Sequence, residues 1–339
     1  MEITNWIYDD FLFPLMENFI DPKKRVSFYY LLSAIFIACL WSAWAKKLTI
    51  RETIKELRHR LFRKKLWLSD SARGDYKLFL ANHTLLILTA PLLISKVTVS
   101  TSVFFFLHEE FPAGAALIAT VSPVLVATVY TVFLFLADDL SRFATHLALH
   151  RWSFLWVFHK THHSAETMNP FTVYRAHPVE VLIFSLRSIV VQASSIALFV
   201  FLFGSSIELV TIYGVNVFLF IFNATGANLR HSHVQIRYGR RLERLVICPS
   251  QHQVHHSIDP LHHDKNFGAA LAIWDWAAGT LYTAPKDNQL EFGLDKDQKV
   301  GTHSLTSLYF SPFLPLIRAL TRWKNTIHLT CKKRSKHAF

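Results

Sequence analysis

Three short blocks of histidine limit the possible folds of this chain more than any other feature. The blocks read HLALH from His146, HKTHH from His159 and HQVHH from His252. Residues i, i+3 and i+4 lie on one face of an α-helix, so each block presents its imidazoles along one helical face. The spacing therefore predicts three helices whose imidazoles can enclose metal.

The histidines are concentrated in one part of the sequence. Of 19 histidines, 13 lie between His146 and His263, and eight of these form the three blocks. A single histidine is usually a surface or hydrogen-bonding residue, but a surface tract would not group eight of them at helical spacing. Imidazole suits iron, copper, nickel and zinc, whereas calcium and magnesium prefer oxygen ligands. Because one tetrahedral zinc needs four ligands, the blocks predict two metal ions or one ion with an unusually rich ligand set.

The composition indicates a membrane protein. The chain has 339 residues, is 51% hydrophobic and contains 29 Phe and 9 Trp but only 10 Gly, as expected for long apolar helices. The three cysteines have no paired spacing, which argues against a disulfide framework and a cysteine-ligated cluster. Basic residues border apolar segments, so anionic lipid explains the net charge of +12 without a nucleic-acid partner.

Five apolar segments are long enough to cross or enter a bilayer. They cover residues 27–45, 78–95, 113–137, 182–203 and 207–227. Only Gly204, Ser205 and Ser206 join the last two, which predicts a helical hairpin that crosses the membrane twice or dips into it.

The basic segment 46–65 sets the predicted orientation. It carries nine Lys or Arg residues against two Glu residues, so we expect it in the cytoplasm, anchored on lipid headgroups. The following spans return the chain to this side before His146, and the hairpin does so again before His231. We therefore expect an all-α integral membrane protein with four or five transmembrane or re-entrant helices. A histidine-rich helical cap on the cytoplasmic face would hold a dimetal site.

The chain shows no internal repeat and no low-complexity linker. We expect an N-terminal membrane anchor over residues 1–137, a catalytic region over 138–280 and a cytoplasmic tail over 281–339. Asp139 repeats with His146 and His150 at helical spacing. Two roles are open for its carboxylate: it could orient a ligating imidazole, or it could be a charge near a helix N-terminus.

The three blocks together resemble the HxxxH, HxxHH and HxxHH signature of the sterol desaturase and fatty acid hydroxylase superfamily of membrane di-iron oxygenases. RAHPVE around His177, LRHSHV around His231 and HHDKNFG ending at Gly268 also resemble stretches found between and after those blocks. The resemblance covers residues 138–280. The joint pattern is highly specific, although any one block alone is a weak signal.

The resemblance implies a set of nine metal ligands, with His231 added to the eight histidines of the blocks. These are His146, His150, His159, His162, His163, His231, His252, His255 and His256. His177 could be a cap, a hydrogen-bonding residue or a ligand, and His233 is expected to be a polar neighbour. We expect His262 and His263 in a surface loop, and Asn266 and Gly268 in a turn.

The resemblance also implies two iron ions, dioxygen and external electrons, used to hydroxylate or desaturate an unactivated C–H position of a lipid. No glycine-rich dinucleotide fingerprint and no fused haem domain is visible in the sequence. Electrons from NAD(P)H should therefore arrive through a separate protein of the haem cytochrome or ferredoxin type. The lipid class stays open among sterol, fatty acyl, sphingolipid, ether lipid and carotenoid.

Other readings of the histidines lead to different functions. A zinc-dependent membrane hydrolase could use the same histidine cage, but it would need fewer ligands and no dioxygen. A metal transporter or a haem-binding subunit would place histidines inside the spans, whereas these crowd just beyond the span ends. A non-catalytic lipid-binding protein is disfavoured because no block is incomplete. His303 and His337 lie outside the blocks, and we expect their replacement to have little effect.

Overall fold

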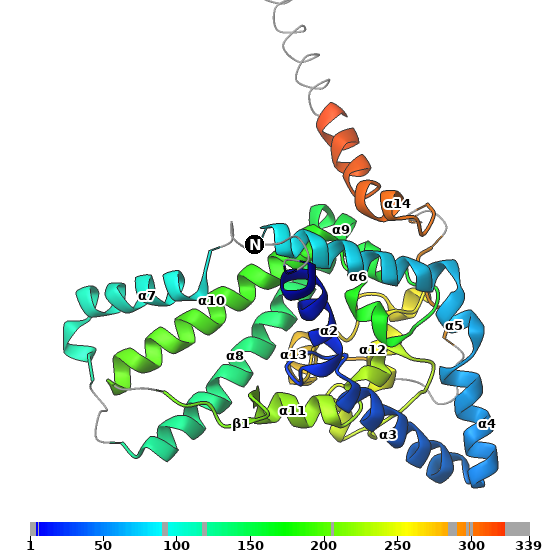
Figure 1. Ribbon diagram of the computed structural model, residues 1–339, viewed down its shortest axis with the longest axis horizontal. Coiled ribbons are helices and arrows are strands. Elements are labelled where there is room, and N and C mark those ends of the chain that lie inside the picture. Colours follow the sequence, from blue (N-terminus) through cyan, green and yellow to red (C-terminus); the bar gives the residue numbers. More distant parts are fainter. Residues whose placement is uncertain are drawn as a thin grey trace, which may run out of the picture.

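A computed structural model describes residues 5, 7–89, 94–116, 121–204, 207–283, 290–295, 298 and 301–322. This part of the chain is mostly helical, with one short antiparallel β-hairpin (Figure 1). The principal helices are α2 (Phe13–Ile20), α3 (Phe28–Lys46), α4 (Ile50–Leu61), α5 (Lys64–Leu68), α6 (Asp70–Thr89), α7 (Lys96–Glu110), α8 (Pro123–Arg151), α9 (Ser153–His163), α10 (Pro178–Phe203), α11 (Val217–Ala224), α12 (Pro249–His255), α13 (Ile273–Ala278) and α14 (Leu305–Phe310). The expected all-α membrane fold is confirmed.

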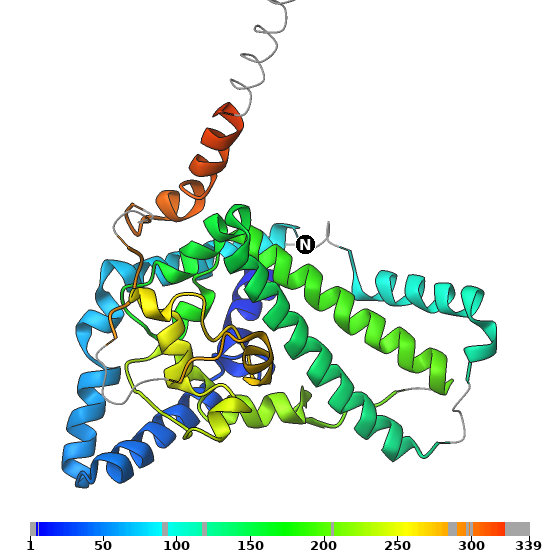
Figure 2. The ribbon, with the colours of Figure 1, turned by 180° about the vertical axis from the view of Figure 1, so that it is seen from behind.

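Three of the described helices are long and apolar enough to cross a membrane: α3, α8 and α10. Helices α8 and α10 run side by side in both ribbon views, and α7 packs along α10 (Figures 1 and 2). Small residues let other elements approach α3, where Ala34 and Ala38 pack with Leu57 of α4 and with Leu229. These contacts join the membrane helices to the polar part of the molecule.

The predicted spans differ from the structure in three places. Of the span predicted over 78–95, residues 78–89 are the C-terminal part of α6, residues 90–93 lie outside the described part and residues 94–95 are not helical. Helix α6 starts earlier and carries Asp75 and Lys77, so it is less apolar than expected. The span predicted from residue 113 begins at Pro123, where proline is favourable in the first helical turn.

The helical second arm predicted over 207–227 was wrong. This segment forms strands β1 (Thr211–Ile212) and β2 (Val215–Asn216) and then α11, which has 8 residues and is too short to cross a bilayer. Gly214 adopts a φ of +72° in the turn between the strands. Asn216 then begins α11, because its side chain accepts a hydrogen bond from the backbone N–H of Phe218. Local turn and cap chemistry therefore overrides the apolar run.

The histidine-bearing elements meet at one end of α8. Trp152 has an extended backbone (φ −102°, ψ 115°), which ends α8 and lets α9 pack back against it. Two 3-10 helices, η4 (Pro170–Tyr174) and η5 (Ala227–His231), also belong to this cap. Helix α6 packs against η4, and α12 packs against η5. Segments distant in the sequence thus surround the end of α8.

Candidate metal centre

The structure brings all nine predicted ligands into two neighbouring groups. Within each group, one ring nitrogen from every residue lies within 4.8 Å of the others. The first group, here called the five-histidine group, consists of His146, His150, His159, His163 and His255. The second, the four-histidine group, consists of His162, His231, His252 and His256.

Helical geometry explains how the ligands are divided. On α9, His159 and His163 are four residues apart and both join the five-histidine group, whereas His162 turns toward the four-histidine group. At α12 the pattern is reversed: His252 and His256 join the four-histidine group, whereas His255 joins the five-histidine group. Two HxxHH blocks facing each other therefore supply both groups.

Backbone and carboxylate oxygens orient the imidazoles of the five-histidine group. The Nδ1 atoms of His146, His159 and His255 lie 2.7–2.9 Å from an oxygen acceptor. These acceptors are the carbonyl oxygens of Phe267 and Lys265, for His146 and His255, and Oε1 of Glu180, for His159. Fixing Nδ1 in this way orients Nε2 for a metal and sets the tautomer that can bind one.

The opposite nitrogens of this group lack protein partners. Among the described residues, Nε2 of His150, His159, His163 and His255 is buried without a hydrogen bond. A buried polar atom left unpaired costs about 1–3 kcal/mol, so four of them converging in one place require an explanation. A metal ion ligated by these nitrogens would satisfy them all.

The four-histidine group has the spacing of a ligand set. Nε2 of His252 lies 3.1 Å from Nε2 of His231 and 3.3 Å from Nε2 of His256. Two nitrogens bound to one ion at about 2.0–2.1 Å, at tetrahedral or right angles, are separated by about 2.9–3.4 Å. The carbonyl oxygen of Arg175 orients the ring of His162, because it lies 3.1 Å from Nδ1 of that ring.

Burial keeps these imidazoles neutral. Desolvation lowers the pKa of His159 and of His162 to about 3. It also lowers the pKa of His252, His255 and His256 well below the usual value, and neighbouring imidazoles lower it further. Metal ligation requires the neutral form, so these side chains are ready to bind a cation at neutral pH.

Acid should therefore destabilise the metal-free protein. His159 and His162 have folded-state pKa values near 3, whereas the unfolded chain has values near about 6.5. Between these limits the unfolded state binds more protons at each of the nine clustered histidines, all of which have a lowered pKa; this outweighs Glu180, whose pKa is raised to about 8 and acts in the opposite direction. The free energy of unfolding therefore falls as the pH is lowered. We expect a lower Tm at pH 5.5 than at pH 7.5 for metal-free protein in detergent. An equal or higher Tm at pH 5.5, with unchanged helical content before heating, would contradict this.

Asp139 does not have either role that the sequence suggested. It lies inside α8, not at its N-terminus, and its carboxylate accepts hydrogen bonds from the backbone N–H groups of Ala270 and Leu271 and from Nε1 of Trp274. It therefore fixes the loop that follows Phe267 and does not contact an imidazole directly. The reason is its orientation on α8, which points the carboxylate at this loop.

Two supporting residues were missed by the sequence analysis. Glu180 lies in the first turn of α10, where an acid is expected for helix-dipole reasons alone, yet its carboxylate contacts His159. Gln253 lies inside the HQVHH block, and its Nε2 donates to the carbonyl oxygens of Leu229, Ser232 and Val234, each at 2.9 Å. Gln253 thereby fixes η5, and with it His231, against α12.

The remaining candidate histidines lie outside both groups. His177 caps α10, accepting from the backbone N–H of Val179, and its Nε2 lies 3.0 Å from the carbonyl oxygen of Tyr309. His233 accepts from the backbone N–H of Met168 at 3.4 Å, as a polar neighbour would. The surface prediction was wrong for His262, which is 2% exposed and packs against Tyr282.

The predicted turn at Asn266 and Gly268 is confirmed. Asn266 has a φ of +57°, and its side chain donates to the carbonyl oxygens of Gln251 and Tyr282. At Gly268, a Cβ would lie 2.4 Å from the carbonyl oxygen of Leu271. Only glycine fits there, and the resulting turn aims the carbonyl of Phe267 at His146.

A small cavity adjoins the five-histidine group. It has a volume of about 210 Å³ and is lined in part by His150, Trp156, His163, His255 and the exposed Asp264. Ligand pockets usually enclose about 300–1,000 Å³, so this space can hold part of a lipid molecule beside the group but not a whole one.

The fold and this site define a membrane protein with two adjacent groups of histidines, each of which could hold a metal ion. The model of the fatty acid hydroxylase family matches residues 131–280, which carry all nine ligands. The resemblance to the sterol desaturase and fatty acid hydroxylase superfamily is thus confirmed over residues 131–280, slightly less than half of the chain.

Known relatives include lipid-modifying enzymes. Alkylglycerol monooxygenase from Danio rerio is 30% identical over 176 residues, which cover 52% of this chain and 35% of that protein. The Homo sapiens alkylglycerol monooxygenase is 28% identical over 181 residues, 52% of this chain and 36% of that protein. An ornithine lipid hydroxylase from Rhizobium tropici is 28% identical over 153 residues, 45% of this chain and 41% of that protein. The chain thus spans about a third of the alkylglycerol monooxygenases it matches. No solved structure matches.

Proposed function

We propose that this protein is a membrane-bound di-iron oxygenase that hydroxylates an unactivated C–H position of a lipid. The observation that carries this proposal is the pair of adjacent histidine groups inside the fatty acid hydroxylase region. Nine clustered imidazoles exceed what one tetrahedral zinc requires, and imidazole is a good ligand for iron. The names of the relatives favour hydroxylation over desaturation.

The residues fit a pair of iron ions. The five-histidine and four-histidine groups would each hold one, and both contain neutral imidazoles with ring nitrogens facing inward. When bound, such a pair supplies the activation of dioxygen that is needed to break a C–H bond. The chain itself orients the imidazoles through Glu180 and through the carbonyl groups of Phe267, Lys265 and Arg175.

The substrate in this proposal is a polar lipid with an alkyl chain. The relatives' names refer to an alkylglycerol and to an ornithine lipid, which share an alkyl or acyl chain on a polar group. The cavity of about 210 Å³ beside the five-histidine group would admit only the segment that carries the reacting carbon. Trp156 and His150 line it and would contact that segment.

Electrons would come from a separate protein, ultimately from NAD(P)H. The partner would be of the haem cytochrome or ferredoxin type, and it would dock on the basic cytoplasmic face. This assignment rests on the basic segment 46–65 and on the lack of a dinucleotide fingerprint in the sequence. In the same proposal α3, α8 and α10 lie in the membrane as transmembrane or re-entrant helices, and both histidine groups lie on the cytoplasmic side.

Isotope labelling tests the reaction. Membranes containing the protein, a reductant and total polar lipid would be incubated under ¹⁸O₂, with a His255→Ala variant as the control. We expect a lipid product that carries one ¹⁸O atom and is absent in the control. A product lacking two hydrogens would instead support desaturation. Product formed equally without dioxygen would favour the zinc hydrolase and contradict the proposal.

Cysteine labelling tests the topology. Single cysteines at Glu166 and Leu261, both exposed, would be introduced after the three native cysteines are replaced by serine. We expect a membrane-impermeant maleimide to label both positions from the cytoplasmic side of sealed vesicles, since the two positions follow different histidine blocks on the same face. Labelling of the two positions from opposite sides would overturn the predicted topology.

A further inference from the structure

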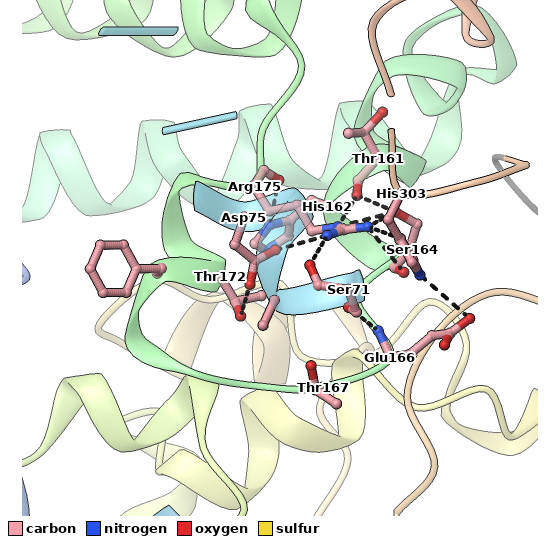
Figure 3. Close-up of polar contacts among 12 residues, drawn as sticks. Ser71, Asp75, Thr161, His162, Ser164, Glu166, Thr167, Thr172, Arg175 and His303 are labelled. Carbon is pink, nitrogen blue, oxygen red and sulfur yellow. Dashed lines mark hydrogen bonds and ion pairs between the residues drawn. The ribbon is translucent and has the colours of Figure 1, made fainter. Parts of the chain in front are cut away.

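Behind the four-histidine group lies a buried ion pair that the proposed reaction does not use. The guanidinium of Arg175 and the carboxylate of Asp75 are both 0% exposed, and Nη1 of Arg175 lies 2.8 Å from Oδ1 of Asp75 (Figure 3). Burying two charges is costly, and an ion pair rarely stabilises a protein more than apolar residues of the same size would. Its presence therefore calls for a role other than stability.

Arg175 forms hydrogen bonds with the end of α9 through its own side chain and its own backbone. Its Nε donates to the carbonyl oxygen of Thr161 at 3.0 Å and to Oγ of Ser164 at 3.1 Å. Its own carbonyl oxygen accepts from Nδ1 of His162 at 3.1 Å. The residues on either side of His162–His163 and the ring of His162 are thus fixed by one arginine, as Figure 3 shows.

Asp75 and α6 hold this arginine in place. Oδ2 of Asp75 accepts from Oγ1 of Thr172 at 2.9 Å and from Nδ2 of Asn169 at 3.3 Å, which joins η4 to α6. The guanidinium also packs onto the backbone of α6, because a Cβ added to Gly74 would lie 2.9 Å from Nη1 of Arg175. A glycine inside a helix is normally unfavourable, so Gly74 is explained by this close approach.

The C-terminal segment completes the network. Nη2 of Arg175 lies 2.7 Å from Nδ1 of His303, and Nε2 of His303 lies 3.7 Å from the carboxylate of Glu166. His303 is therefore not an isolated histidine, and the expectation that its replacement has little effect needs revision. Gly74, Asp75 and His303 all lie outside the family-matched residues 131–280. Parts of the chain beyond that region thus support the histidine cap.

We propose that the Asp75–Arg175 pair positions His162 and thereby sets the metal affinity of the four-histidine group. Arg175 is a positioning residue in this role. The five-histidine group has supports of its own, since Glu180 and two backbone carbonyls orient three of its rings. Loosening the ion pair should therefore weaken metal binding in one group selectively. This inference rests on the proposed metal centre.

Cobalt titration of metal-free protein tests the proposal. Co²⁺ has ligand-dependent visible absorption, so it reports each imidazole site without any assay of the reaction. The parent protein is expected to bind two Co²⁺ ions. Asp75→Asn keeps the shape of the side chain, and Gly74→Ala keeps every charge. In each variant the affinity for one of the two Co²⁺ ions should fall by about 10–100-fold, as is typical when a residue that hydrogen-bonds to a metal ligand is lost. His303→Ala should show a smaller loss in the same direction.

Combining Gly74→Ala with the loss of a ligand from one group shows which group is weakened. In His150→Ala the four-histidine group remains intact, and adding Gly74→Ala should lower the affinity of that site. In His162→Ala the five-histidine group remains intact, and adding Gly74→Ala should change its affinity little, because Glu180 and two backbone carbonyls still orient three of its rings. Asp138→Asn serves as a matched control, since Asp138 forms a half-buried ion pair with Arg187 that touches no ligand.

Each result bears on a different claim. The positioning role would be overturned if Asp75→Asn and Gly74→Ala bound both Co²⁺ ions as tightly as the parent protein does. It would also be overturned if the two histidine groups lost Co²⁺ affinity equally, or if Asp138→Asn lost as much Co²⁺ affinity as these variants. A parent protein that binds no Co²⁺ would instead overturn the proposed metal centre itself. Should Asp75→Asn fail to fold, Gly74→Ala decides the question, because it leaves the buried charges paired.

Discussion

Replacing His159 or His255 with alanine is expected to abolish lipid oxidation and to reduce the bound metal, while the protein still inserts into the membrane. Both rings belong to the five-histidine group, and both have a buried Nε2 without a protein partner. Loss of an outer partner typically lowers metal affinity or activity by about 10–100-fold. Loss of the ligand itself should exceed this, so activity should fall to the background.

Metal content per chain is the measurement that checks this result. Detergent-extracted parent protein should contain close to two irons per chain, and the His159→Ala, His255→Ala double variant should lose at least the iron of the five-histidine group at unchanged elution volume. His59→Ala is the matched control, because His59 is exposed on α4 and remote in sequence from the histidine blocks. Full activity or full metal content in either single variant would contradict the ligand assignment. Zinc alone in the parent would require iron reconstitution before a conclusion.

The second large effect is expected at Glu180. Its carboxylate lies 2.9 Å from Nδ1 of His159, and both side chains are buried. A buried carboxylate in this position orients the ring and makes the imidazole a better ligand. Burial raises the pKa of Glu180 to about 8, and a cation held by the neighbouring imidazoles would favour its ionised form. Glu180→Gln keeps the shape of the side chain but cannot ionise, so we expect about a 10–100-fold loss of metal affinity in the five-histidine group.

Asp264 provides the comparison for Glu180. It also faces a ligand, since its carboxylate lies 3.6 Å from Nδ1 of His150, but it is exposed to solvent. Solvent-exposed ion pairs contribute little, so Asp264→Asn should change metal affinity far less than Glu180→Gln. Equal losses in the two variants, measured by cobalt titration, would show that burial of the carboxylate is not the deciding factor.

The sequence predicted much of the site because helical periodicity is local. Spacings of three and four residues place His146 with His150, or His252 with His256, on one face whatever the rest of the chain does. The resemblance added His231, and the structure places all nine histidines together. The long apolar runs likewise predicted α3 and α10, because a run of about 20 apolar residues needs only its own backbone to form a helix in a membrane.

Interactions between distant segments could not be read from the sequence in the same way. His146 is oriented by the carbonyl group of Phe267, 121 residues away, and nothing in a local pattern identifies that acceptor. Asp139 matched the expected helical spacing, yet it binds a loop, whereas Glu180 supports a ligand from a helix start that looked ordinary.

The sequence alone therefore determined the class of protein, the membrane helices α3 and α10 and the ligand candidates, because these depend on composition and local periodicity. Only the tertiary structure divided nine ligands into groups of five and four and showed that α6 supports one of them through Asp75 and Arg175. The physical reason is that burial and hydrogen bonding at the centre come from elements that meet only after the chain has folded. The apolar run at 207–227 illustrates a different limit, since the turn at Gly214 and the cap at Asn216 act locally against its hydrophobicity.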